Sequence, residues 1–210
     1  MKASAKAYPI QGLIKYHGLR DEALRLPYHD SISVATSPTE SHTTIEFGDF
    51  GRDSGQLDSR ELQGRELERV VTVVDEVRRR AGSDARFRMM SRNNFPSNVG
   101  LGSSASGFAA LALASSEALG LCLTLEQVSI IARRGAGSAT RSVTGGFSRW
   151  KAGHDDEESY SFQIASEEFE MGIVVALVPA FKYTESAHKA VLGSPFFHSR
   201  LAYIHGALAE

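Results

Sequence analysis

A Gly- and Ser-rich stretch between two regular elements constrains the fold of this chain more than any other feature. It covers residues 91–107, reads SRNNFPSNVGLGSSASG, and joins a strand-like run at residues 86–90 to an apolar run at residues 108–119. A strand–loop–helix junction gathers free backbone N–H groups and the positive end of a helix dipole at one point, which favours phosphate binding. A serine-capped helix start without a ligand is the alternative, and Gly and Ser alone leave both open.

Composition limits the classes of function. The chain has 210 residues, enough for one large domain or a domain and a fraction. Its net charge of −2 gives no reason to expect a nucleic-acid partner, and its apolar runs are shorter than the roughly 18 residues of a membrane span. A single cysteine, Cys122, excludes an internal disulfide and fits a cytoplasmic protein. Because Cys122 lies in an apolar run, we expect a buried, inert thiol.

The first half of the chain predicts strands and one helix. A strand followed by a tight turn is expected within residues 2–15. Strands are also expected at residues 31–35 and 43–47, and these two are expected to pair antiparallel. Residues 48–59 are rich in Gly, Asp and Ser, which is typical of a surface loop. Apolar residues then recur at helical spacing from residue 62, and Gly82 ends this helix after three arginines that we expect to be solvated.

The second half alternates helices and strands. A nearly all-apolar helix at residues 108–119 predicts a central, buried position. Thr124 and Gln127 have the spacing of a capping box and open the next helix. Strands are expected at residues 147–150 and 160–164, and a central, buried strand at residues 171–178; an acidic turn at residues 154–158 is expected to be solvated. Helical patterning resumes at residue 185 and continues to residue 209, with a break at residues 193–195.

This order of elements predicts the fold class. Strands, a helix, a strand, the Gly/Ser loop, two helices, strands and further helices follow one another. The order is typical of an α+β domain with a mainly antiparallel sheet and helices packed on one side.

Three segments in a fixed order carry a family resemblance. Residues 14–22 read IKYHGLRDE, residues 91–108 read SRNNFPSNVGLGSSASGF, and residues 137–147 begin GSATRS and end GGF. Together they resemble the mevalonate diphosphate decarboxylases of the GHMP kinase superfamily, over nearly the whole chain. The resemblance implies a GHMP-type N-terminal ATP-binding domain (ribosomal protein S5 domain 2-like) over residues 1–180. It also implies that residues 181–210 begin the C-terminal GHMP domain.

The resemblance implies an activity and its partners. Enzymes of this family phosphorylate the 3-hydroxyl of a phosphorylated mevalonate with ATP and Mg²⁺, and then lose phosphate and CO2 together. The expected protein is therefore an ATP-dependent carboxy-lyase of the mevalonate pathway, with a small-molecule substrate. Decarboxylases of this family are often homodimers.

Site residues follow from the matching positions. Lys15 is expected at the reacting end of the substrate with Tyr16 beside it, and both Lys15 and Arg141 are the expected catalytic residues. Arg141 is also expected to hold the substrate carboxylate, assisted by Ser138. The expected ATP-binding residues are Ser91, Asn93, Asn94, Gly100, Leu101, Gly102, Ser103 and Ser104, and the Ser104 hydroxyl is expected nearest Mg²⁺. Without the resemblance, Lys15 and Arg141 are ordinary surface cations and the Asn pair is a turn.

Departures from the family pattern indicate the substrate. Leu19 stands where the diphosphate decarboxylases carry a second Lys, and Ala136 stands where they carry Ser. One cation fewer favours mevalonate 5-phosphate, with isopentenyl phosphate as product, and residues 9–18 resemble the phosphomevalonate decarboxylases of archaea and some bacteria. The alternatives are a diphosphomevalonate decarboxylase, a mevalonate 3-kinase, against which Lys15 argues, and a non-catalytic binding domain on a GHMP scaffold.

The family's catalytic aspartate is expected in a second lobe. The last aspartate of this chain is Asp156, so we expect the chain to be the N-terminal portion of such an enzyme. On that interpretation it binds ATP weakly and does not turn over. A downstream aspartate in a Gly/Ala-rich turn of the native gene would discriminate an enzyme from a binding domain.

Overall fold

The fold is built around a five-stranded sheet. The computed structural model describes residues 1–97, 99–165, 171–176 and 184–209. The sheet has the order β1-β6-β9-β7-β8. Its strands are β1 (Lys2–Ala7), β6 (Ser41–Gly48), β7 (Ser54–Leu57), β8 (Arg60–Glu61) and β9 (Arg86–Asn93). All pairings are antiparallel except that of β7 with β9.

A second sheet extends from the end of β1. It has the order β11-β10-β5-β2, and its strands are β2 (Ile10–Ile14), β5 (Ser31–Ala35), β10 (Phe147–Trp150) and β11 (Ser161–Ala165). Two short strands, β3 (Leu19–Asp21) and β4 (Leu26–Pro27), pair with each other. The chain passes from the first sheet to the second at Pro9, which cannot donate a ladder hydrogen bond.

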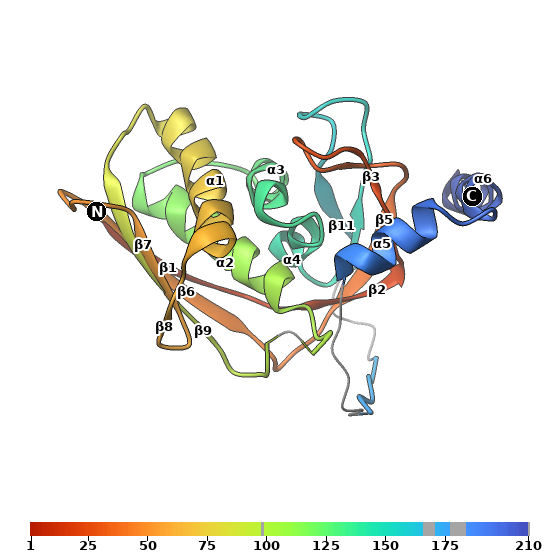
Figure 1. Ribbon diagram of the computed structural model, residues 1–210, viewed down its shortest axis with the longest axis horizontal. Coiled ribbons are helices and arrows are strands. Elements are labelled where there is room, and N and C mark those ends of the chain that lie inside the picture. Colours follow the sequence, from red (N-terminus) through yellow and green to blue (C-terminus); the bar gives the residue numbers. More distant parts are fainter. Residues whose placement is uncertain (98, 166–170, 177–183, 210) are drawn as a thin grey trace.

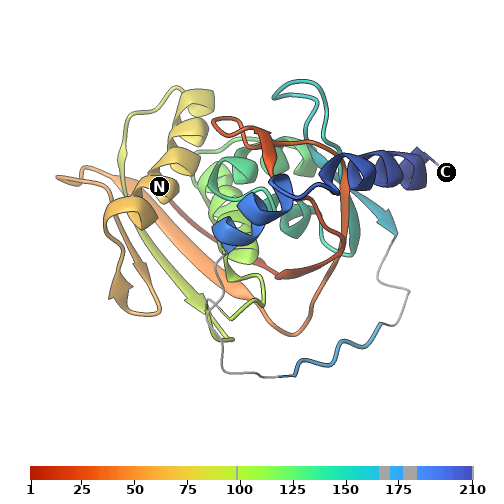
Figure 2. The same cartoon turned by 45° about the vertical axis from the view of Figure 1, so that its right-hand side comes forward.

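Four helices gather on one face of the five-stranded sheet (Figure 1). They are α1 (Gly64–Ala81), α2 (Ser103–Ala118), α3 (Leu125–Gly135) and α4 (Ala139–Thr144). Two more helices, α5 (Thr184–Leu192) and α6 (Phe197–Ala209), follow, and α6 lies at the end of the molecule opposite the N-terminus (Figures 1 and 2). The predicted α+β class, with a mainly antiparallel sheet and helices on one side, is confirmed.

Helix α2 is the centre of the hydrophobic core. Its alanines at positions 105, 109, 110, 112 and 114 have no exposed surface, so strands β1 and β6 and helices α1, α3 and α4 pack closely around it. Strand β9 alternates buried and exposed side chains and turns Phe87 and Met89 toward this core. The predicted capping box of α3 is present, with reciprocal hydrogen bonds between Thr124 and Gln127.

Two predicted features of the sheets are wrong. Strands β5 and β6 do not form a hairpin, because β5 pairs with β2 and β10 while β6 pairs with β1 and β9. Both strands pair instead with strands that are distant in the sequence. The periodicity of a strand does not reveal which other strand it pairs with. The expected loop at residues 48–59 contains β7, whose sequence SGQL lacks the alternation of a typical strand.

The predicted central strand at residues 171–178 is also wrong where it can be assessed. Residues 171–176 form neither strand nor helix, and the Val174 side chain is 97% exposed; residues 177–178 lie outside the described part of the chain. An apolar run becomes a buried strand only where a sheet edge pairs with it, and no described strand pairs with these residues. Cys122, expected to be buried, is exposed.

Two charged groups that we expected to be solvated are ion-paired. Arg78 is 7% exposed, and its guanidinium donates to the Asp53 carboxylate over 2.6 and 3.0 Å. In the acidic turn, Asp156 accepts from the fully buried Arg133 and from Arg134. Each pair links segments that a sequence window does not compare, so local charge patterns could not reveal them.

The Arg78–Asp53 pair yields a test of the fold. Replacing Asp53→Asn should lower the free energy of unfolding by about 2–3 kcal/mol, because it removes the buried carboxylate that pairs with Arg78 and leaves the half-exposed Asp75 as the counter-charge of this guanidinium. Urea unfolding followed by circular dichroism measures this value. Burial opposes ionisation, but the Arg78 hydrogen bonds and the Phe87 amide hold the pKa of Asp53 below 3.8. The difference between wild type and variant should therefore shrink as the pH falls below about 4.

The control is an exposed ion pair on the same sheet. Arg52 and Glu61 lie 3.4 Å apart with side chains 82% and 51% exposed. Glu61→Gln should change the free energy of unfolding by less than about 1 kcal/mol. Equal losses in the two variants would contradict the assignment of stability to the buried pair.

Candidate functional site

A cavity of about 450 Å³ lies beside the first turns of α2. This volume is within the usual range for a small-molecule site. Its walls come from β6, β7, β9, α1 and α2 and from the loop after β9. The lining residues are Thr43, Leu57, Asp58, Arg60, Leu62, Glu66, Arg69, Val70, Met89, Ser91, Asn93, Ser97, Ser103, Ser104, Gly107, Phe108 and Leu111.

Half of the predicted nucleotide-binding residues line this cavity. Ser91, Asn93, Ser103 and Ser104 do so, whereas Asn94, Gly100, Leu101 and Gly102 do not. The Asn94 amide donates to the Pro38 carbonyl over 2.9 Å and accepts from the Glu40 N–H over 2.7 Å. These bonds hold the loop against the residues just before β6. The Asn94 side chain therefore has the structural role of a turn residue, which was the alternative to nucleotide binding.

The start of α2 is available to an anion. Its N-cap is Gly102, with φ +84°, so no side chain caps the helix, and its first turn contains no acidic residue. A Cβ at Gly102 would lie 3.2 Å from the Ile10 carbonyl oxygen, so glycine is needed for both the backbone angle and the close approach to β2. Uncapped N–H groups at a helix start are suited to phosphate.

The cavity also contains residues that the sequence did not mark as functional. Arg69 of α1 lies with its guanidinium 4.7 Å from the ring centre of Phe108, and it donates to the Gly135 carbonyl over 2.6 and 3.1 Å. In the sequence Arg69 is one of many charges on an amphipathic helix, and nothing distinguishes it. Only the packing of α1 against α2 and α3 places it there.

Arg141 forms a second group of site residues with two aromatic rings. Its guanidinium lies 5.6 Å from the ring centres of both Tyr16 and Trp150, and these rings meet edge to face at 4.9 Å. The Arg141 side chain donates to the Ser31 hydroxyl, while its buried Nε has no hydrogen-bond partner. Within the described part of the chain, no carboxylate pairs with it.

Burial controls the protonation of this group. Arg141 is 3% exposed, and burial lowers its pKa to about 10, so it remains charged at neutral pH. Burial also raises the pKa of Tyr16, against the opposing effect of Arg141 and a hydrogen bond from the Ser138 backbone. A buried cation with a spare donor and no counter-charge is the arrangement that an anionic ligand would complete.

Lys15 and Ser138 lie beside this group. Ser138 is the half-buried N-cap residue of α4, the helix that carries Arg141. Lys15 is exposed at the end of β2, next to Tyr16, and its alkyl chain packs along Gly12. The structure therefore brings Tyr16, Ser138 and Arg141 together, with Lys15 as their neighbour in the chain.

Two contacts connect the cavity with the Arg141 group. Gly102 at the start of α2 packs on Ile10, the first residue of the strand that ends just before Lys15. Arg69 in the cavity bonds to Gly135, at the end of α3 and just before Ser138. The uncapped start of α2 and the buried Arg141 are thus positioned by neighbouring residues of the same two segments, β2 and the end of α3.

Comparison with known proteins identifies this arrangement. Residues 7–161 match the family described as the diphosphomevalonate decarboxylase-like N-terminal domain. The chain belongs to this family. It is 51% identical to the phosphomevalonate decarboxylase of Haloferax volcanii over 212 aligned positions, which cover all of this chain and 65% of the relative. The chain therefore spans about two thirds of the length of that relative.

Solved structures agree with the family. The mevalonate diphosphate decarboxylase from Staphylococcus aureus superposes with a TM-score of 0.86 at 36% identity, over all of this chain and 66% of that one. A second structure, described as MDDEF in complex with MVAPP, AMPPCP and magnesium, superposes with a TM-score of 0.85 at 30% identity. It likewise covers all of this chain and 66% of its own. In the described residues, no helix of this decarboxylase-like domain is long and apolar enough to cross a membrane.

The residues of the cavity fit ATP better than a protein-bound metal. Ser104 is exposed and offers one hydroxyl, but the described residues contain no cluster of three side chains able to hold a metal ion. The carboxylates of Asp58 and Glu66 line the cavity, where Asp58 accepts from the Asn93 N–H and Glu66 pairs with Arg60. A Mg²⁺ ion here would be held mainly by nucleotide phosphates, as is usual for this ion.

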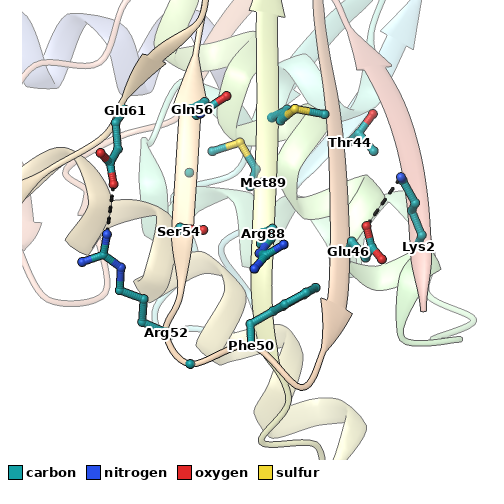
Figure 3. Close-up of a pocket in the computed structure, with 13 residues that line it drawn as sticks. Lys2, Thr44, Glu46, Phe50, Arg52, Ser54, Gln56, Glu61, Arg88 and Met89 are labelled. Atoms are coloured by element: carbon teal, nitrogen blue, oxygen red, sulfur yellow. Dashed lines mark hydrogen bonds and ion pairs between the residues drawn. The ribbon is translucent and has the colours of Figure 1, made fainter.

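A larger cavity, of about 530 Å³, lies on the outer face of the five-stranded sheet (Figure 3). Its walls include Arg88 and Met90, which alternate with the core-facing residues of β9. None of the predicted site residues lines it. Size alone therefore does not locate the functional site of this domain.

The position of Gly102 yields a test of the phosphate site. Gly102→Ala should destabilise the protein by about 1–2 kcal/mol, because alanine is strained at positive φ, and should weaken ATP binding several-fold by displacing the start of α2. Chemical unfolding and ATP titration calorimetry measure the two effects. Gly206→Ala, inside α6 with open space around the Cβ, is the control. It should stabilise by about 0.5–1 kcal/mol and leave ATP affinity unchanged; a Gly102 variant with unaltered ATP affinity would argue against this site.

The missing counter-charge of Arg141 yields a second test. Arg141→Met should leave the free energy of unfolding unchanged or raise it by about 1–2 kcal/mol, because it removes a desolvated charge without stranding a carboxylate. The matched variant Arg133→Met removes the donor of the Leu24 and Ser159 carbonyls and leaves Asp156 with Arg134 alone, so it should lower that free energy by about 3–5 kcal/mol. Urea unfolding compares the two. Similar losses would mean that Arg141 is a structural arginine.

Proposed function

We propose that the protein containing this chain catalyses the ATP-dependent decarboxylation of mevalonate 5-phosphate to isopentenyl phosphate. The observation that carries the proposal is the buried Arg141, which has no carboxylate partner among the described residues and lies against Tyr16, the residue after Lys15. The 51% identity to a phosphomevalonate decarboxylase supports the same assignment.

The proposed reaction has two steps. The substrate 3-hydroxyl oxygen attacks the γ-phosphorus of ATP, the hydroxyl proton is lost, and ADP leaves. The C3–O bond then breaks with departure of phosphate, while the electron pair of the C1–C2 bond forms the new double bond and CO2 leaves. Catalysis in such a reaction consists mainly of positioning and of neutralising charge.

The Arg141 group would hold the substrate. The Arg141 guanidinium, with its spare Nε donor, would bind the carboxylate until it leaves as CO2, and Ser138 would donate a second hydrogen bond. Tyr16 and Trp150 exclude water from one side of the guanidinium, which strengthens its attraction for an anion. Lys15 would neutralise charge that develops at the departing phosphate.

The cavity beside α2 would hold ATP. The uncapped N–H groups of α2 and the hydroxyls of Ser103 and Ser104 would bind the phosphates, with the remainder of the predicted Gly-rich segment, Gly100 to Gly102, around them. Ser91 and Asn93 would contact the nucleotide, as would the loop at Asn94. The related complex with AMPPCP and magnesium supports ATP with Mg²⁺, for which Ser104 is the proposed side-chain ligand.

Two substitutions favour the monophosphate substrate. Leu19 in β3 and Ala136 before α4 stand where the family resemblance implies a lysine and a serine in the diphosphate enzymes, so a second phosphate would find fewer partners. The alternative, a diphosphomevalonate decarboxylase, is favoured by the names of the solved structures in the family. We further propose that residues 1–180 form the ATP-binding domain, that residues 181–210 begin the next one, and that the protein is a cytoplasmic homodimer.

The decisive experiment measures CO2 release. The protein expressed from its complete gene is given ATP, Mg²⁺ and either mevalonate 5-phosphate or mevalonate 5-diphosphate labelled at C1. We expect labelled CO2 from the monophosphate at a kcat/KM at least tenfold above that for the diphosphate. Lys15→Met should lower the rate at least a hundredfold, because it removes the cation beside the reacting centre.

Lys2→Met is the matched control, because its side chain is 60% exposed and lines the cavity on the outer face of the five-stranded sheet (Figure 3), where none of the predicted site residues lies. It should leave the rate unchanged. ADP formation without CO2 would identify a 3-kinase, a preference for the diphosphate would identify the alternative decarboxylase, and ATP binding without turnover would identify a binding protein.

A further inference from the structure

Helix α6 delivers a second arginine to the Lys15 loop. The Arg200 Nη2 donates to the Lys15 carbonyl over 3.0 Å and to Nδ1 of His17 over 3.0 Å. These contacts cross more than 180 residues of sequence, and the sequence alone gives no sign of them. Arg200 is therefore held at the loop that carries the proposed substrate residues.

Helix α5 closes the same loop from another side. The Gly18 N–H donates to Nδ1 of His188 over 3.2 Å, and the His188 ring meets the Tyr16 ring edge to face at 5.3 Å. Leu192 lies where a side chain at Gly18 would be. Residues 15–18 are thus held between β2 and the two last helices.

Arg200 differs from the structural arginines of this protein. Buried Arg78 and Arg133 each contact a carboxylate, Asp53 and Asp156 respectively. Arg200, like Arg141, has a buried Nε without a hydrogen-bond partner, and in the described residues no carboxylate forms an ion pair with it. A guanidinium that keeps a buried donor unused is suited to an anionic ligand.

The described groups around Arg200 are two histidine pairs, Lys15 and one carboxylate that is already ion-paired. Burial first, and then the charges of Arg200, His188 and Lys15, lower the pKa of His17 to about 4, so His17 is neutral and accepts from Arg200. His29 and His205 face the same region. The nearby Asp30 carboxylate is engaged by Arg149 and by the Ala152 N–H, both over 2.7 Å.

A row of contacts joins the two unpaired guanidiniums. Arg141 lies over Tyr16, Tyr16 meets His188, His188 lies 5.8 Å from the His17 ring, and His17 accepts from Arg200. The two cations therefore lie at opposite ends of one row of side chains, with Lys15 beside it. Such a row suits a ligand with an anion at each end.

We propose that Arg200 binds the 5-phosphate of the substrate while Arg141 binds its carboxylate. The inference rests on the proposed function, because mevalonate 5-phosphate carries these two anions at its two ends. A planar guanidinium can donate two hydrogen bonds to one phosphate, and His17 and the Lys15 carbonyl hold Arg200 in place for this. Arg200 is then the residue through which this protein distinguishes phosphorylated from free mevalonate.

The test compares two ligands by titration calorimetry. The protein expressed from its complete gene is titrated with mevalonate 5-phosphate and with mevalonate, as wild type and as Arg200→Gln. We expect Arg200→Gln to weaken binding of the phosphorylated ligand about ten- to hundredfold and to leave mevalonate binding unchanged. Arg200→Lys should recover part of the affinity, because it restores the charge without the planar fork.

Two controls separate the possible failures. Arg141→Gln should weaken both ligands, and Arg79→Gln, at a side chain 66% exposed on α1, should weaken neither. Equal binding of mevalonate 5-phosphate by wild type and Arg200→Gln would overturn the inference and leave the proposed function standing. Equal weakening of both ligands by Arg200→Gln would also overturn it, as a merely structural role. A wild type that binds neither ligand would overturn the proposed function itself.

Discussion

The burial of α2 is the constraint on which the rest of the structure depends. A helix whose alanines have no exposed surface must be covered all round, and here β1, β6 and three helices cover it. This packing fixes the start of the helix against Ile10, where glycine at position 102 allows the backbones to approach. The same contact therefore completes the core and holds uncapped N–H groups beside the strand that leads to Lys15.

The buried arginines of the protein fall into two kinds, according to whether a carboxylate pairs with the guanidinium. Arg78 and Arg133 are buried against Asp53 and Asp156, and so they fasten loops to helices. Arg141 is similarly buried, but the partners of its guanidinium in the described part of the chain are Ser31 and two aromatic rings. Desolvation without a counter-charge opposes folding, and this is the kind of cost that proteins accept at sites that bind a ligand.

The sequence predicted much of the fold because its signals were local. The apolar periodicity of α1, the capping box of Thr124 and the alternation in β9 each act within a few residues. It failed where the partner was distant: the pairing of β5, the presence of β7 and the contact of Arg78 with Asp53. These depend on which segments meet after folding, which a window along the chain does not contain.

The sequence by itself determined the chemistry available: a Gly- and Ser-rich helix start, a lysine loop and an arginine segment, in the order of one family. These are determined locally because backbone conformation and side-chain type are properties of the residues themselves. Only the tertiary structure decided that Arg69 enters the cavity, that Arg141 is buried without a carboxylate, and that Arg200 reaches His17. These features depend on packing, because every segment that surrounds a side chain contributes to its desolvation and decides which partners it can reach.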